Sequence, residues 1–166
     1  MSKGQYITYR IIGAVMTLLA YFFFFMALAV AFNLGFHADL LLGLFVSGCM
    51  VIYTNLSRLF VHIVVKEQRP IRRTLKDWII VNALVVIGGL GYDIFRMWLQ
   101  ALNKALSEET LGILNKAAAD AGSVAGPITH DMLVEISVFL SVIIGIGIVH
   151  AVWTLLLVKR FKASFQ

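Results

Sequence analysis

Residues 11–32 read IIGAVMTLLAYFFFFMALAVAF, and this stretch of 22 residues without a charge decides the class of the protein. About 20 apolar residues in a helix are enough to cross a bilayer. Ala29-Val30-Ala31 resembles a signal-peptide cleavage site, but the apolar stretch before it is longer than the about 7–15 residues of a signal peptide. We therefore expect residues 11–32 to be a retained membrane span.

Three further apolar stretches follow the first. They cover residues 40–65, 78–100 and 132–158. We predict an all-α fold, a polytopic transmembrane four-helix bundle that residues 1–166 form as a single domain. The composition agrees, because 60% of the residues are hydrophobic and 14% are charged, whereas soluble domains are about half apolar and a quarter charged. This excludes a soluble enzyme, a disordered tail and a nucleic-acid-binding module.

The basic residues outside the spans are strongly biased to one side of the membrane. Of the 14 Lys and Arg residues, ten lie in the two termini and in the loop 66–77. The other side has only Lys104 and Lys116, while Arg58 and Arg96 lie within spans. Since cytoplasmic loops are enriched in Lys and Arg, we expect both termini in the cytoplasm and the spans in the plasma (inner) membrane.

The loop 101–131, which this topology places outside, has the pattern of one short helix. Ser107 is followed by two glutamates, which is typical of an N-cap and a first helical turn. We predict an amphipathic outer helix from Ser107 to Ala121 between the third and fourth spans. Thr129 or Asp131 is then expected to cap the fourth span.

Polar residues inside the spans form two groups at different depths. The inner polar cluster lies near the predicted cytoplasmic ends of the spans. Its members are Asn55, Arg58, His62, Asn82 and His150. Because the cluster contains no acid, we predict that it binds an anion between the second, third and fourth spans, with a phospholipid headgroup favoured over a small permeating anion. Alternatively, Arg58 snorkels to the headgroups and no site exists.

The outer charge cluster consists of Asp93, Arg96 and Glu135, about 5–10 Å from the predicted outer ends of their spans. Asp93 and Arg96 are i,i+3 neighbours on one helix, and Glu135 lies at a matching depth on another. We favour a neutralised ion-pair network that fixes helix register over a transport role.

The sequence lacks the motifs of an enzyme or a metal site. It has no H-E-x-x-H motif, no nucleophile elbow and no paired carboxylates beside a base. Its one cysteine, Cys49, forms neither an internal disulfide nor a zinc site. His62 and His150 are the two histidines within spans, but their expected depths differ by roughly 7 Å, which is awkward for the axial ligands of one haem. We therefore predict no enzymatic activity, no cofactor and no metal.

The function expected from these features is that of a non-enzymatic, oligomeric or complex-associated membrane subunit. The alternatives are an oligomeric small channel or transporter with an anion-attracting inner pocket and, ranked last, a haem-bearing electron-transfer subunit. The expected partners are anionic lipids on the cytoplasmic side and either further copies of the chain or a larger membrane complex. Small residues suggest surfaces for helix association: Gly13, Ala20, Ala27 and Ala31 in the first span, and Gly145 and Gly147 in the fourth.

Overall fold

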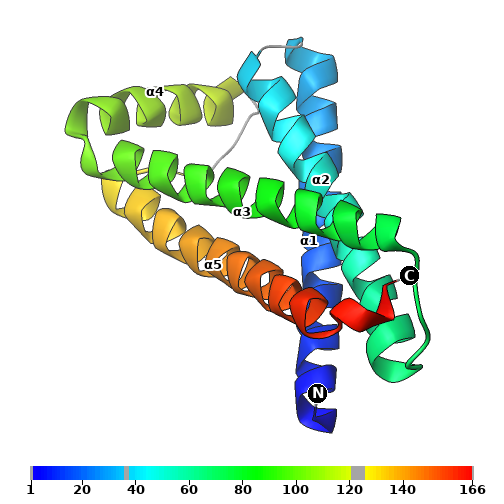
Figure 1. The fold of residues 1–166 in the computed structure, drawn as a ribbon. Coiled ribbons are helices and arrows are strands. Elements are labelled where there is room, and N and C mark those ends of the chain that lie inside the picture. The colour runs from blue at the N-terminus through cyan, green and yellow to red at the C-terminus, as the bar shows by residue number, and fades with distance from the viewer. Residues whose placement is uncertain (1, 36–37, 121–125, 166) are drawn as a thin grey trace. The chain divides into compact units, whose positions relative to one another are not determined.

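The computed structural model describes residues 2–35, 38–120 and 126–165 of the chain, and every named element in these ranges is a helix (Figure 1). In chain order they are α1 (Lys3–Leu34), α2 (Ala38–Phe60), η1 (Val61–Lys66), α3 (Arg73–Leu102), α4 (Lys104–Asp120), α5 (His130–Arg160) and η2 (Lys162–Ser164). Within the described ranges, four helices are long and apolar enough to cross a membrane: Lys3–Asn33, Leu40–Lys66, Arg73–Leu102 and His130–Arg160. The prediction of an all-helical fold with four helices suited to span a membrane is confirmed for these ranges.

Helix α1 begins eight residues before the apolar run because polar side chains cap it. The Ser2 hydroxyl accepts a hydrogen bond from the backbone of Gln5 at 3.2 Å, and the Gln5 side chain accepts one from the backbone of Ser2 at 3.0 Å. This reciprocal pair satisfies two otherwise unpaired N–H groups. At the other end Gly35 has a φ of 84°, a left-handed conformation that favours glycine, and it ends the helix.

The second span continues past α2 into a π-helical segment, η1, at the end next to the basic loop. In this segment the backbone N–H of Glu67 donates to the carbonyl of His62 at 3.2 Å, five residues earlier. Gln68 follows with a φ of 54°, and Pro70 then lies before α3, where a proline ends helical structure.

The amphipathic helix after the third span exists, but its start differs from the prediction. Helix α4 begins at Lys104, and the side chain of Asn103 accepts a hydrogen bond from the backbone of Leu106 at 3.4 Å. Ser107 is therefore not the N-cap; it lies inside the helix and is buried. Asn103 takes this role because Asx side chains cap helices as well as serine does. The predicted end at Ala121 lies outside the described residues.

The start of the fourth span agrees with the prediction. The Thr129 hydroxyl accepts a hydrogen bond from the backbone of Met132 at 3.4 Å, and the Thr129 carbonyl accepts one from Leu133 at 3.0 Å. Thr129 therefore caps α5, one of the two residues that the sequence offered for this position.

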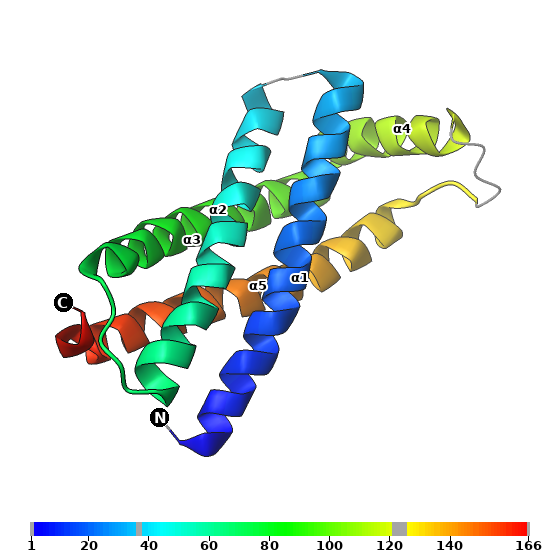
Figure 2. The same cartoon turned by 90° about the vertical axis from the view of Figure 1, so that its right-hand side faces the viewer.

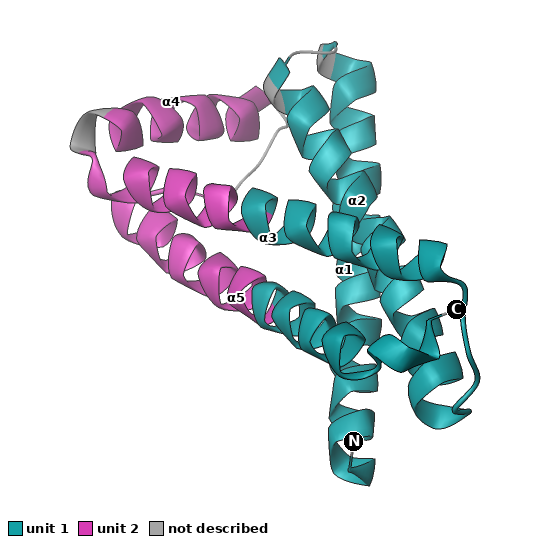
Figure 3. Ribbon diagram, viewed as in Figure 1, with its two compact units in different colours: residues 1–89, 147–166 teal, residues 90–146 magenta. Residues whose placement is uncertain are grey.

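The chain divides into two compact units (Figure 3), and the larger consists of Met1–Gly89 and Gly147–Gln166. In this unit α1 and α2 are antiparallel and lie side by side (Figure 2). Its hydrophobic core is formed by residues from α1, α2, η1, α3 and α5: Tyr9, Phe60, Val61, Val64, Ile79, Leu157 and Val158. The rings of Phe60 and Phe165 stack with centroids 5.6 Å apart, so the C-terminal segment also belongs to this core.

Small residues allow close helix contacts inside the larger unit. A Cβ on Gly89 of α3 would lie 2.5 Å from a methyl group of Val46 on α2, which leaves no room for a side chain. Ala20 and Ala31 of α1 are 0% and 1% exposed. Gly13, Ala20 and Ala31 of the small-residue stripe of the first span are therefore buried within this chain, while Ala27 is only partly buried. Gly145 of α5, in contrast, has nothing within 4 Å of a Cβ position.

The smaller unit, Leu90–Ile146, is held by polar contacts between its segments. The indole N–H of Trp98 donates to the Ser141 hydroxyl at 3.0 Å. The amide of Asn115 on α4 makes two hydrogen bonds to the backbone of Ile128, 2.6 and 3.1 Å long. These bonds connect α4 to the segment that leads into α5.

Candidate functional site

The most densely connected polar site is a buried cluster in the larger unit, which we call the Tyr–His cluster. It consists of Tyr9 on α1, Tyr53 on α2, and His150 and Thr154 one turn apart on α5. The Thr154 hydroxyl lies 2.6 Å from the Tyr9 hydroxyl and 2.7 Å from that of Tyr53. Tyr53 also lies 2.8 Å from Nδ1 of His150. All four side chains are at most 1% exposed.

The hydrogen bonds of the Tyr–His cluster limit where its protons lie. The carbonyl of His150 accepts from the Thr154 hydroxyl at 2.9 Å and from the Tyr53 hydroxyl at 3.2 Å. Because each hydroxyl has one proton, either Thr154 donates to this carbonyl and Tyr53 donates to Thr154, or Tyr53 donates to the carbonyl and Thr154 donates to Tyr53. In both arrangements Tyr9 donates to Thr154 and the Tyr53 oxygen accepts the N–H of Nδ1 of His150, which leaves the lone pair of the histidine on Nε2.

The free side of the His150 ring faces a glycine on α1. Nε2 is buried and has no hydrogen-bond partner among the described residues. It lies 3.2 Å from the position that a Cβ on Gly13 would take, and the ring of Tyr9 lies against the imidazole with centroids 4.5 Å apart. Gly13 therefore permits the contact between α1 and α5 that brings Tyr9 to Thr154.

The geometry of the Tyr–His cluster is that of a helix clamp. Its hydroxyl protons are all donated within the cluster, it contains no carboxylate, and water does not reach it. The cluster ties α1, α2 and α5 together through hydroxyl groups that bond to one another and to His150, while Nε2 of His150 has no hydrogen-bond partner among the described residues.

The residues of the predicted inner polar cluster do not form one site in the structure, because they have different neighbours. Arg58 and His150 both border Gly13, since the Arg58 Cγ lies 3.9 Å from the Cβ position there. His62 is exposed, and its Nε2 lies 3.1 Å from a carboxylate oxygen of Glu67. The expectation that no acid accompanies this group overlooked Glu67, which lies two residues after the end of the predicted second span.

The two asparagines of the predicted inner cluster bond mainly to their own helices. Asn55 donates to the Val51 carbonyl at 2.8 Å and to the Tyr21 hydroxyl at 3.2 Å, and it remains exposed. Asn82 is buried and donates to the carbonyl of Trp78 at 2.8 Å. The helix backbone thus satisfies one donor of each amide.

The three residues of the predicted outer charge cluster all belong to the smaller unit. Asp93 and Arg96 lie on α3 and Glu135 lies on α5. All three side chains are exposed. This exposure, inside helices of membrane-spanning length, is the feature that most needs a functional explanation.

Sequence reasoning found one member of the Tyr–His cluster, His150, and missed the other three. Tyr9 precedes the apolar run of the first span, and Tyr53 and Thr154 lie in stretches of high hydropathy. A search for hydroxyl-bearing residues at one depth of the spans is a signal that finds them, because buried Tyr and Thr hydroxyls require partners.

No group of three or more His, Cys, Asp or Glu side chains is placed to hold a metal ion within the ranges that the structure describes. No known protein family, curated protein or solved structure matches the chain. The site therefore has to be interpreted from its own geometry.

Proposed function

We propose that the chain is a non-enzymatic subunit of an oligomer or larger complex in the plasma (inner) membrane, with both termini in the cytoplasm. The observation that carries this proposal is the exposure of Asp93 and Glu135 on membrane-spanning helices. A carboxylate inside a bilayer is costly, and the cost reaches about 2.5–3.5 kcal/mol at the centre on insertion scales, an upper bound for these two residues near the outer ends of their spans. A second protein surface, or water held between protein chains, removes this cost.

One face of α3 supports the proposal particularly well. At 100° per residue, Asn82, Gly89, Asp93 and Arg96 fall within an arc of roughly 60°. Asn82 is 3% exposed and Gly89 touches Val46, so the arc is covered by protein in the larger unit. Further along the same helix, Asp93 and Arg96 are exposed. One end of this helix face is thus covered by protein, and the other end is charged and exposed. This difference supports the proposal that a second protein chain covers the exposed end.

The exposed face of α5 gives an independent argument. Glu135 lies at the centre of a stripe of large apolar side chains, each within about 60° of it around the helix. These residues are Met132, Phe139, Val142, Ile146 and Val149, between 46% and 66% exposed. Lipid covers an apolar stripe readily, but the acid in its centre favours protein contact. Gly145, open on the same helix, allows a neighbouring helix to approach closely.

A non-enzymatic role is supported by the sealed Tyr–His cluster, whose hydroxyl and imidazole groups act on each other. An oligomeric channel or transporter is the second candidate, because the exposed Asn55 and Arg58 on α2 are side chains that also suit a polar conduit between protomers. Anionic lipids are proposed as partners in either case, since the basic loop and termini attract them.

The experiment that tests the proposal places a photoreactive amino acid at Phe139, one turn from Glu135, in the full chain in native membranes. The matched control is Leu18 on α1, which is 73% exposed against 66% for Phe139 and has no acid beside it. We expect a covalent adduct with protein from position 139, a several-fold weaker adduct after Glu135→Gln, and lipid adducts alone from position 18.

Lipid adducts alone from both positions would contradict the proposed subunit role. Anion flux through liposomes containing the purified chain, lost in Arg58→Ala, would favour the channel instead. A Soret band in the optical spectrum of the purified protein would revive the haem-bearing alternative, for which the described geometry gives no argument.

A further inference from the structure

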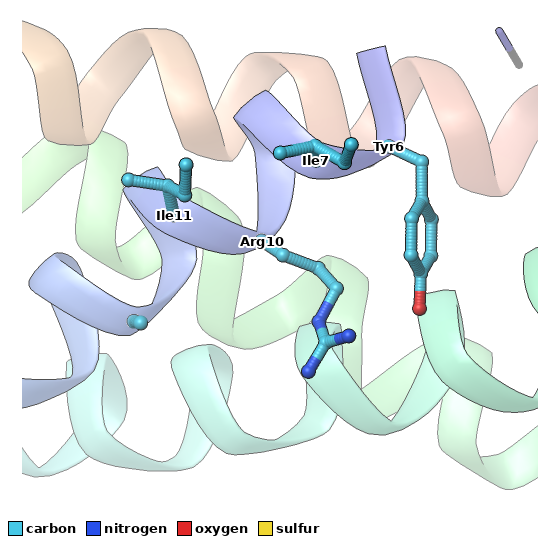
Figure 4. A pocket seen from close by; sticks show the side chains of 5 residues that line it. Tyr6, Ile7, Arg10 and Ile11 are labelled. Carbon is cyan, nitrogen blue, oxygen red and sulfur yellow. The ribbon is translucent and has the colours of Figure 1, made fainter. Parts of the chain in front are cut away.

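A shallow depression of about 290 Å³ lies along the first turns of α1, at the end of the span next to the predicted cytoplasmic surface. It is lined by Tyr6, Ile7, Arg10, Ile11 and Ala14 (Figure 4). Figure 4 shows the Arg10 and Tyr6 side chains extending from α1 in the same direction, with Ile7 and Ile11 beside them. We propose that this depression binds an anionic phospholipid, with its phosphate on Arg10 and an acyl chain on the isoleucines.

The guanidinium of Arg10 is held in place but has donors to spare. Its central carbon lies 5.7 Å from the centroid of the Tyr6 ring, a cation–π contact. Tyr6 in turn packs against the hydrophobic core of the larger unit, so the ring forms a fixed platform. Across the described ranges no acidic side chain forms an ion pair with Arg10. Its planar array of five N–H donors therefore remains suited to a phosphate.

The position of Arg10 along the helix matches the level of lipid phosphates. Arg10 is the last charged residue before the charge-free run of residues 11–32. At 1.5 Å per residue it lies about 10 Å above the first residue of α1, Lys3. The guanidinium thus sits where the apolar part of the span begins, the depth at which basic side chains meet headgroups.

The apolar wall of the depression distinguishes a lipid from a soluble anion. Ile7 and Ile11 are 48% and 60% exposed, and Ala14 and Leu18 continue the same helix face toward the membrane interior. A free phosphate gains nothing from these side chains, whereas an acyl chain that extends from a headgroup on Arg10 covers them. Charge and apolar surface together therefore select an anionic phospholipid.

The test uses the full-length chain, purified and delipidated in detergent, and measures bound phosphatidylglycerol by native mass spectrometry during a titration. Arg10→Gln is expected to weaken binding about five-fold, as for loss of one basic contact at a lipid surface. The matched control is Arg160→Gln, which removes another exposed arginine outside the depression and, as one of several basic residues that attract anionic lipid, is expected to weaken binding less than Arg10→Gln does. Phosphatidylcholine is expected to bind the wild-type chain more weakly than phosphatidylglycerol.

Two further variants separate the parts of the site and guard against misfolding. Tyr6→Phe keeps the ring and is expected to bind like the wild type, whereas Tyr6→Leu removes the platform and is expected to weaken binding. Ile11→Ser is expected to weaken phosphatidylglycerol binding. The ability of inorganic phosphate to compete with phosphatidylglycerol is expected to stay unchanged. Equal binding by Arg10→Gln and the wild type, or equal losses in the Arg10 and Arg160 variants, would overturn the proposal. If Ile11→Ser binds phosphatidylglycerol as the wild type does, the depression binds a phosphate group without an acyl chain, and the proposal is overturned as well.

Discussion

The Tyr–His cluster of the larger unit and the outer charge cluster of the smaller unit differ in their exposure. In the larger unit, Tyr9, Tyr53, His150 and Thr154 are buried and form hydrogen bonds to one another. In the smaller unit, Asp93, Arg96 and Glu135 are exposed on helices of the same apolar character. Because charged groups are costly inside a membrane, we propose that the first arrangement belongs to the fold of this chain and that the second is covered by a neighbouring chain.

The largest effect is expected from Thr154→Val, which keeps the shape of the side chain and removes the hydroxyl that bonds to both tyrosines. Tyr9 is then left with an unpaired buried hydroxyl, so we expect the free energy of unfolding to fall by about 2 kcal/mol. The measurement is unfolding in mixed detergent, followed by circular dichroism. The control is Thr17→Val, because the Thr17 hydroxyl donates only to the Gly13 carbonyl of its own helix at 2.6 Å. Equal stabilities of the two variants would show that the Tyr–His cluster does not clamp the helices.

The covered part of the α3 face is tested by a pair of adjacent glycines. Gly89→Ala places a methyl group 2.5 Å from Val46, whereas Gly88 has nothing within 4 Å of its Cβ position. We expect Gly89→Ala to be about 1–2 kcal/mol less stable than Gly88→Ala, because overpacking outweighs the helix propensity that both variants gain. Adding Val46→Ala to Gly89→Ala should restore the lost stability, because it makes room for the new methyl group. If the order of stabilities is reversed, α2 and α3 do not pack through Gly89.

A smaller effect is expected from Tyr9→Phe. This change removes one hydroxyl and leaves Thr154 bonded to Tyr53 and to the His150 carbonyl. No polar group is orphaned, so we expect a loss of about 0.6 kcal/mol, the average for side-chain hydrogen bonds within membranes. If the free energy of unfolding falls as much as in Thr154→Val, the hydroxyl of Tyr9 does more than make one hydrogen bond. It then also holds the Tyr9 ring in position.

The smallest effect on the isolated chain is expected in the smaller unit. Glu135 is exposed, so Glu135→Gln should change the free energy of unfolding of the detergent-solubilised monomer by less than about 0.5 kcal/mol. The same substitution should nevertheless weaken assembly, measured as the fraction of chain in a larger complex. A marked loss of monomer stability would place Glu135 in the fold of this chain and remove it from the proposed interface.

The sequence was sufficient to predict the spans because hydropathy is a property of each segment alone. The helix ends predicted from the sequence are wrong where polar residues extend a helix. Ser2 and Gln5 start α1 well before the apolar run, and Asn103 replaces Ser107 as the cap of α4. Local capping chemistry of this kind is visible in the sequence, but several candidates compete at each end.

The Tyr–His cluster was largely beyond prediction because its contacts are distant along the chain. Tyr9 and Thr154 are separated by 145 positions, and Tyr53 and His150 by 97. Helical periodicity shows which residues share a face of one helix, but it does not show which faces meet. The depth argument marked His150 and Arg58 as polar residues to explain, and the structure places both next to Gly13.

The proposed subunit role is tested most directly by the mass of the chain extracted from its native membrane in lipid discs, measured over a range of concentrations. The account predicts an assembly larger than the 18.5 kDa of one chain, and a shift toward the single chain in the Asp93→Asn, Glu135→Gln double variant. A species of 18.5 kDa at every concentration would contradict the account.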